Sequence, residues 1–114
     1  MEDCIFCKII DRQLPSTIVY EDDNIIAFND IHPQAPVHVL IVPKKHITSV
    51  REINSDTAGY VVDIHLAANK IAEKLGILDK GFRLINNCGK DAGQTVLHLH
   101  YHLIGGITLG EQLI

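Results

Sequence analysis

Seven residues near the C-terminus, His98-Leu99-His100-Tyr101-His102-Leu103-Ile104, constrain the fold more than any other part of the chain. Histidine alternates with apolar residues at every second position, which is the periodicity of a strand whose successive side chains point to opposite faces. We therefore expect a strand over Gln94 to Ile104. Its three histidines should lie on one face about 7 Å apart, and the apolar residues between them should enter the core.

Three imidazoles on one strand allow several kinds of chemistry. Imidazole is the commonest metal ligand in proteins and also the side chain that titrates nearest neutral pH. The three could be solvated side chains on an exposed face, or they could share one metal ion. Side chains about 7 Å apart cannot all reach one ion with bonds near 2 Å unless the strand bends. The spacing therefore favours different roles for the different histidines.

The rest of the pattern predicts an α+β fold with an antiparallel sheet covered on one face by a single main helix. Apolar residues recur at three- and four-residue steps from Ser55 to Leu75, which is typical of an amphipathic helix that Asn54 or Ser55 caps and Gly76 ends. The other expected strands cover residues 17–20, 24–29, 37–42 and 82–86, the first two forming a hairpin.

Length and charge limit the classes of function. A chain of 114 residues fits one domain, residues 1–114. Its formal net charge of -4 argues against nucleic acid as a partner, because binding along phosphates needs clustered Lys and Arg. The uncharged stretch from Ile31 to Pro43 is interrupted by Pro33 and Pro36 and is too short for a membrane span. The N-terminus carries no secretory pattern, so we expect a cytoplasmic protein with reduced thiols.

The pair Cys4 and Cys7 forms a CxxC motif, which alone could be a redox pair, half of a zinc site or a coincidence. No βαβ unit surrounds it, which argues against a thioredoxin-like redox motif. An odd number of cysteines in a reducing compartment argues against a disulfide framework, and we expect the third, Cys88, to be incidental.

The histidine alternation, preceded by Gly93-Gln94-Thr95-Val96, resembles the signature of the histidine-triad family, in particular its Hint-type members. The resemblance covers nearly the whole chain. It includes residues 5–10, 21–22, 27–31, 33–36, 42–47 and 105–106. It implies the fold of that family, in which a sheet of about five antiparallel strands packs against one main helix.

The resemblance also implies catalytic roles. His100 would attack the α-phosphorus of a nucleotide and form a nucleotidyl-histidine that water hydrolyses. His102 would donate to a non-bridging phosphate oxygen, and His38 would orient the triad. Thr95 would help to pass a proton to the leaving group, while Gly93 and Gln94 would offer backbone N-H groups to the phosphate.

A purine nucleotide substrate follows from the same resemblance. Asp30 would accept hydrogen bonds from the ribose, and Asn87 would contact the sugar-phosphate. The base would lie in an apolar slot formed by Ile5, Phe6, Ile9 and Ile31. The expected reaction is hydrolysis of purine nucleoside phosphoramidates or related adenylyl conjugates. One alternative is a dinucleoside polyphosphate hydrolase, the activity of another branch of the family, but that branch usually has proline where this chain has Gly105-Gly106. The other alternative is a non-catalytic nucleotide-binding regulator.

Two further expectations concern metal and assembly. Many bacterial-type members of the family bind structural zinc with a CxxC pair and two histidines, which match Cys4, Cys7, His46 and His98 here, and no organic cofactor is expected. The resemblance also implies a homodimer. The helix carries apolar residues beyond its main stripe, including Val62 and Leu66, that a partner could cover. The C-terminal residues 107–114 diverge from the aromatic, proline-containing tail of the best-known members.

Overall fold

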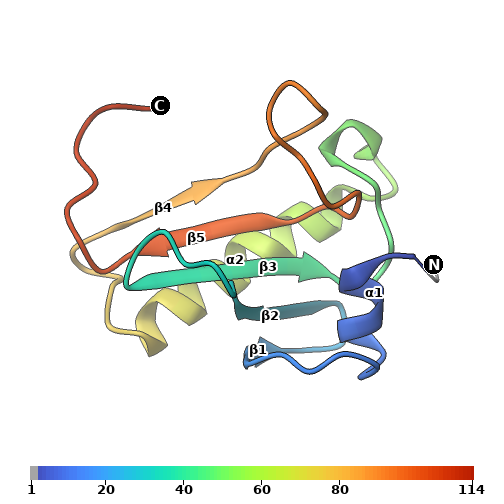
Figure 1. Ribbon diagram of the computed structural model, residues 1–114, viewed down its shortest axis with the longest axis horizontal. Coiled ribbons are helices and arrows are strands. Elements are labelled where there is room, and N and C mark those ends of the chain that lie inside the picture. Colours follow the sequence, from blue (N-terminus) through green and yellow to red (C-terminus); the bar gives the residue numbers. More distant parts are fainter. Residues whose placement is uncertain (1–2) are drawn as a thin grey trace.

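The computed structural model describes residues 3–114, and it has two layers, a sheet and a long helix (Figure 1). Met1 and Glu2, part of the segment behind the localisation prediction, lie outside the described residues. All neighbouring strands run antiparallel in the order β1-β2-β3-β5-β4. The strands are β1 (Ile18–Glu21), β2 (Ile25–Asn29), β3 (Val37–Pro43), β4 (Phe82–Ile85) and β5 (Tyr101–Gly105). The predicted α+β fold is confirmed.

The main helix, α2 (Ala58–Lys74), lies across one face of the sheet (Figure 1). Its buried positions Ile64, Ala68 and Ile71 recur at helical spacing and pack against alternate residues of the strands, including Val39 and Leu103. The helix begins three residues later than predicted, because the Asn54 side chain accepts the N-H groups of Asp56 and Thr57 and forms a turn first. Gly76, at a φ of 76°, ends it as expected.

A short helix that the sequence analysis did not predict, α1 (Ile5–Ile10), covers part of the opposite face. Its buried residues Phe6 and Ile9 are one turn apart and pack on Phe28 and Leu40. The thiol of Cys4 caps the helix by accepting the N-H of Cys7 at 3.4 Å. A second short element, the 3-10 helix η1 (Val50–Glu52), precedes α2. Among residues 3–114, no helix is long and apolar enough to cross a membrane.

The strand predicted over Gln94 to Ile104 is wrong in its first half, since β5 begins at Tyr101. The β3–β5 register pairs Ile41 with Tyr101, so Pro43 would stand opposite Leu99. Proline has no N-H to donate to a ladder. The N-H of Leu99 instead binds the carbonyl of Ile47 at 2.6 Å. Residues 94–100 therefore leave the sheet.

Candidate active site and metal centre

Because residues 94–100 leave the sheet, the three histidines of the alternating segment do not lie in one row. Leu99 and Leu103 enter the core under α2 and Tyr101 packs against it, as predicted. The imidazole of His98 is fully buried beside His46, with ring centroids 4.8 Å apart. The rings of His100 and His102 lie 5.2 Å apart. The expected single row of three imidazoles is thus replaced by one histidine in a Cys/His cluster and a pair beside it.

Main-chain carbonyls fix the tautomers of His98 and His100. Nδ1 of His100 donates to the carbonyl of His98 at 2.8 Å, because a carbonyl oxygen only accepts. In the neutral ring this leaves a lone pair on Nε2 of His100. Nε2 of His98 donates to the carbonyl of Pro43 at 2.8 Å, which leaves a lone pair on its Nδ1. The rings of Phe6 and His100 pack in a T-shaped arrangement, with centroids 5.1 Å apart.

A second chain of hydrogen bonds runs through His38 to His102. The N-H of Gln34 donates to Nδ1 of His38 at 3.0 Å, so the proton of the neutral ring is on Nε2. That Nε2 donates to Nδ1 of His102 at 2.8 Å and lies 3.4 Å from Oδ2 of Asp30. His102 therefore carries its proton on Nε2. Burial, with smaller effects from His100 and His38, lowers the pKa of His102 to about 4, which keeps it neutral near pH 7.

The side chains of Asp30, His38 and His102 lie close enough together to surround a metal ion, yet their hydrogen bonds argue against one. Nδ1 of His38 already accepts the Gln34 N-H. A metal on Nε2 would need the second lone pair of the same ring, and a neutral imidazole has only one. The three residues therefore form a hydrogen-bonded chain, and Nε2 of His102 is its free donor.

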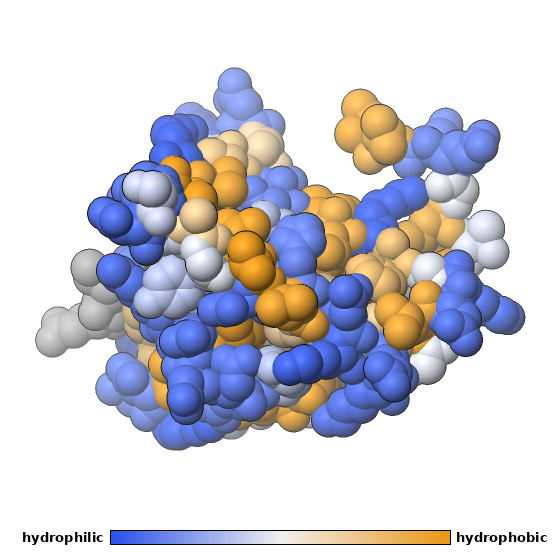
Figure 2. All heavy atoms as spheres, turned by 180° about the vertical axis from the view of Figure 1, so that it is seen from behind, coloured by the Kyte–Doolittle hydropathy of each residue, from blue (hydrophilic) through white to orange (hydrophobic). Residues whose placement is uncertain are grey.

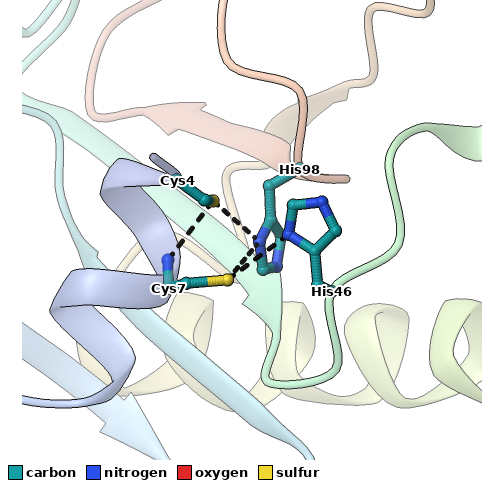
Figure 3. A group of neighbouring side chains, drawn as sticks. All are labelled: Cys4, Cys7, His46 and His98. Carbon is teal, nitrogen blue, oxygen red and sulfur yellow. Dashed lines mark hydrogen bonds between the residues drawn. The ribbon is translucent and has the colours of Figure 1, made fainter. Parts of the chain in front are cut away.

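The other cluster has the donor set of a metal site. Cys4, Cys7, His46 and His98 each direct one ligand atom toward the others, and these atoms lie within 4.8 Å of one another (Figure 3). Sγ of Cys7 is 3.3 Å from Nδ1 of His46, and Sγ of Cys4 is 3.3 Å from Nδ1 of His98. Burial and the adjacent Cys4 thiol raise the pKa of Cys7 to about 11, so two thiolates need a compensating cation. The four residues could hold a metal ion.

The loop before the histidines differs from expectation. The N-H groups of Gly93 and Gln94 donate to the carbonyls of Lys90 and Gly89 at 3.0 and 3.1 Å, so neither is free for a phosphate. The buried Gln94 side chain accepts the N-H of Gly89 and donates to the carbonyls of Thr48 and Val96. Gln94 thus closes the loop, a role that the sequence analysis missed.

The four residues predicted to form the base slot differ in solvent exposure. Phe6 and Ile9 are buried in the cluster under α1, whereas Ile5 and Ile31 are exposed, Ile31 by 84% of its surface. Asn87 is half-buried, and Thr95 is exposed at the rim of a hollow of about 440 Å³. Asp3, Cys4, Ile5, His46, Val96 and Leu97 complete that rim. Asp30 has one carboxylate oxygen bound to the N-H of His32 and the other near His38.

Asn86 is a further residue that the sequence analysis did not identify. Its Nδ2 donates to the carbonyl of His100 at 3.0 Å. The predicted strand over residues 82–86 included Asn86 as its last member, whereas β4 ends at Ile85. Two consecutive asparagines after a strand are the only signal in the sequence, and they do not reveal which backbone group the side chain would bind.

Comparisons with known proteins find relatives along nearly the whole chain. A family model described as "Scavenger mRNA decapping enzyme C-term binding" matches residues 3–111. A purine nucleoside phosphoramidase of Escherichia coli K12 is 46% identical over 112 residues, which cover 98% of this chain and 94% of that protein. A solved HIT family hydrolase from Clostridium thermocellum superposes with a TM-score of 0.98 at 62% identity, covering 100% and 99% of the two chains. A histidine triad protein from Clostridium difficile reaches a TM-score of 0.95 at 52% identity, covering 98% and 97%.

Proposed function

Because the chain belongs to the histidine-triad family, we propose that it is a nucleotidyl hydrolase that cleaves purine nucleoside 5'-phosphoramidates or related adenylyl conjugates. His100 is the nucleophile. Its Nε2 attacks the α-phosphorus, the P–N or P–O bond to the leaving group breaks, and water then hydrolyses the nucleotidyl-histidine to release the nucleoside monophosphate. The observation that carries this assignment is the Nδ1 bond of His100 to the His98 carbonyl, which leaves Nε2 unprotonated.

His102 stabilises the phosphate during this displacement. Its Nε2-H donates to a non-bridging oxygen, where negative charge increases in the transition state. His38 holds His102 in the required tautomer through the bond from its Nε2 at 2.8 Å. A neutral donor suits the role, because the uncharged His102 ring keeps its Nε2-H near pH 7. Thr95, an exposed residue five positions before His100, passes a proton to the departing amine.

The nucleoside occupies the sheet face that carries His38 and His102. The Asp30 carboxylate retains acceptor sites for the ribose hydroxyls, and Asn87 contacts the sugar-phosphate. Ile5 and Ile31 contact the base from their exposed positions, with Phe6 and Ile9 as the apolar floor. Gly93 and Gln94 border the phosphate, and their N-H groups reach it only if they exchange their bonds to Lys90 and Gly89.

Zinc is the metal that best fits the Cys/His cluster. Two thiolates and two imidazoles form a tetrahedral set typical of structural zinc sites, and Nδ1 of His98 carries a lone pair directed at the sulfurs. The site joins α1 to the segment that carries His100. Metal analysis of protein purified without chelator should find about one zinc per chain. Less than a tenth of an equivalent, with no loss of stability in Cys4→Ser, would contradict zinc binding.

The enzyme acts as a homodimer in the cytoplasm. Val62 and Leu66 are exposed on α2 by 57% and 55%, beyond the stripe that covers the sheet, which favours a second copy as their cover. The cytoplasm is a reducing compartment, which keeps the Cys4 and Cys7 thiols available as metal ligands.

The His100→Asn variant tests the nucleophile assignment. Asparagine keeps a polar side chain of similar reach but removes the attacking nitrogen. Turnover of an adenosine phosphoramidate should fall by several powers of ten, each worth about 1.4 kcal/mol of barrier, while AMP affinity by calorimetry changes far less. His102→Ala should lower the rate only partially. If His100→Asn retains more than about a tenth of the wild-type turnover, His100 is not the nucleophile.

A further inference from the structure

The backbone of His100 lies outside both strand ladders that flank it. The last register pair between β3 and β5 joins Ile41 to Tyr101, and the last between β4 and β5 joins Ile85 to His102. His100 comes immediately before β5 and is not paired with either neighbour. The residue whose ring must be held most accurately is therefore not fixed by the sheet itself.

Three hydrogen bonds hold this segment where the ladders have ended. The N-H of Leu99 binds the carbonyl of Ile47 on one side. The ring of His100 binds the carbonyl of His98 within the segment. On the β4 side, Nδ2 of Asn86 donates to the carbonyl of His100 itself at 3.0 Å. Of these three bonds, this one joins His100 to the residue that follows β4. It therefore fixes the distance between the His100 backbone and that edge of the sheet.

We propose that Asn86 is a positioning residue for His100, acting through the His100 carbonyl and without touching the substrate. The proposal rests on the proposed function, in which Nε2 of His100 is the nucleophile. Asn86 is half-buried and its amide replaces the main-chain donor that a continued β4–β5 ladder would supply. Without that donor, the His100 carbonyl loses its partner on this side and the ring no longer has a fixed distance from the phosphorus.

The chemistry of the contact requires a short side chain with an N-H donor. Asparagine supplies two N-H groups on a side chain with only two torsions. An ionised aspartate has the same shape but only accepts, so its oxygen would face the oxygen of the His100 carbonyl. Asn86→Asp therefore removes the donor with little change in volume, and Asn86→Ala removes it without adding charge.

The effect should appear in the chemical step and not in nucleotide binding. Single-turnover transfer of the nucleotidyl group to the protein should slow about tenfold or more in both variants, because small misplacements of a reacting atom are costly. Calorimetric affinity for AMP should stay within about twofold of the wild type. Gln13→Ala, which removes an exposed side-chain amide after α1, is the matched control and should keep the wild-type rate.

The combination of rate and affinity decides the proposal. A single-turnover rate within about threefold of wild type in folded Asn86→Ala would overturn it, as would a rate loss matched by an equal loss of AMP affinity. If Asn86→Ala fails to fold, the same criteria apply to the isosteric Asn86→Asp. His100→Asn in the same assay separates the two claims. If it retains turnover, the proposed function fails, whereas its inactivity beside an unaffected Asn86→Ala rejects only the role of Asn86.

Discussion

Main-chain groups select the tautomers of three imidazoles, those of His98, His100 and His38. The carbonyls of His98 and Pro43 take one ring proton each, and the N-H of Gln34 takes one ring lone pair. These partners are part of the fold and cannot ionise, so the tautomers stay the same across the pH range in which the rings are neutral. The Nε2 lone pair of His100 and the Nε2-H of His102, to which we assign attack and phosphate donation, are therefore in place before substrate arrives.

At the residue scale, the half-buried, neutral ring of His102 predicts a pH dependence of stability. Its pKa falls from 6.5 to about 4 on folding, so the unfolded chain binds more protons between these values. The contribution is complete above about pH 6.5 and is lost as the pH falls toward 4. Urea unfolding of His102→Asn at a series of pH values should therefore show a smaller acid loss than the wild type.

The surface variant His32→Asn serves as the control for this measurement. It also removes one histidine, but an exposed one, and should keep the wild-type pH profile. Parallel profiles for wild type and His102→Asn would contradict the burial argument.

At the scale of elements, sequence patterning predicted the five strands and α2, because α2 has an apolar stripe and because β2 and β3 are apolar runs that are buried on both faces of the sheet. It failed where tertiary contacts decide. α1 has only six residues, too few for a clear helical period, and it depends on Phe6, Ile9 and the Cys4 cap. The alternating pattern of residues 94–104 starts before β5 does. Pro43 ends the ladder at Tyr101, and His98 belongs to the Cys/His cluster and not to the sheet. The hydrogen bonds of Asn86 and Gln94 have no periodic signature.

Two glycines make a matched test of these elements. Gly106 follows β5 at a φ of 87°, and a Cβ there would lie 3.1 Å from Cβ of Pro36. Gly106→Ala should lower the free energy of unfolding by about 1–2 kcal/mol. Gly59 lies in α2 with no atom within 4 Å of an added Cβ, so Gly59→Ala should raise it by about 0.5–1 kcal/mol. Chemical denaturation measures both, and effects of the same sign would contradict the backbone argument.

The same backbone explains why glycine after the histidines bears on substrate class. Proline fixes φ near -65°, which is incompatible with the φ of 87° at Gly106. A family member with proline at this point must turn differently after the triad. The turn in this chain therefore agrees with the phosphoramidase branch that the sequence favoured.

At the scale of the whole molecule, the two faces of the sheet have different roles in the proposed function. One carries His38 and His102, and the other is covered by α2. Figure 2 shows the α2 side, where apolar side chains form a band among polar ones, and Val62 and Leu66 are exposed there. The C-terminal segment leaves the body beside β4, with the Arg83 side chain donating to the carbonyl of Gly110 at 2.9 Å.

If the dimer forms through the exposed face of α2, a charged side chain placed there should separate the subunits. Leu66→Glu places a carboxylate in the proposed interface, where burial without a partner is costly, and should give monomers at micromolar concentration. Leu14→Glu makes the same change at an exposed apolar side chain after α1 and should stay dimeric. Sedimentation decides, and a wild-type monomer at neutral pH would reject the dimer.

The central claim, covalent catalysis by His100, is tested most directly by intact-protein mass spectrometry of a reaction quenched during a single turnover. The wild type should gain one nucleotidyl group that is stable to base and labile to acid, as a phosphorus–imidazole bond requires, and peptide mapping should place it on His100. His100→Asn should gain none while still binding AMP. A wild-type reaction that releases product with no adduct on His100, or an adduct that persists in His100→Asn, would contradict the mechanism.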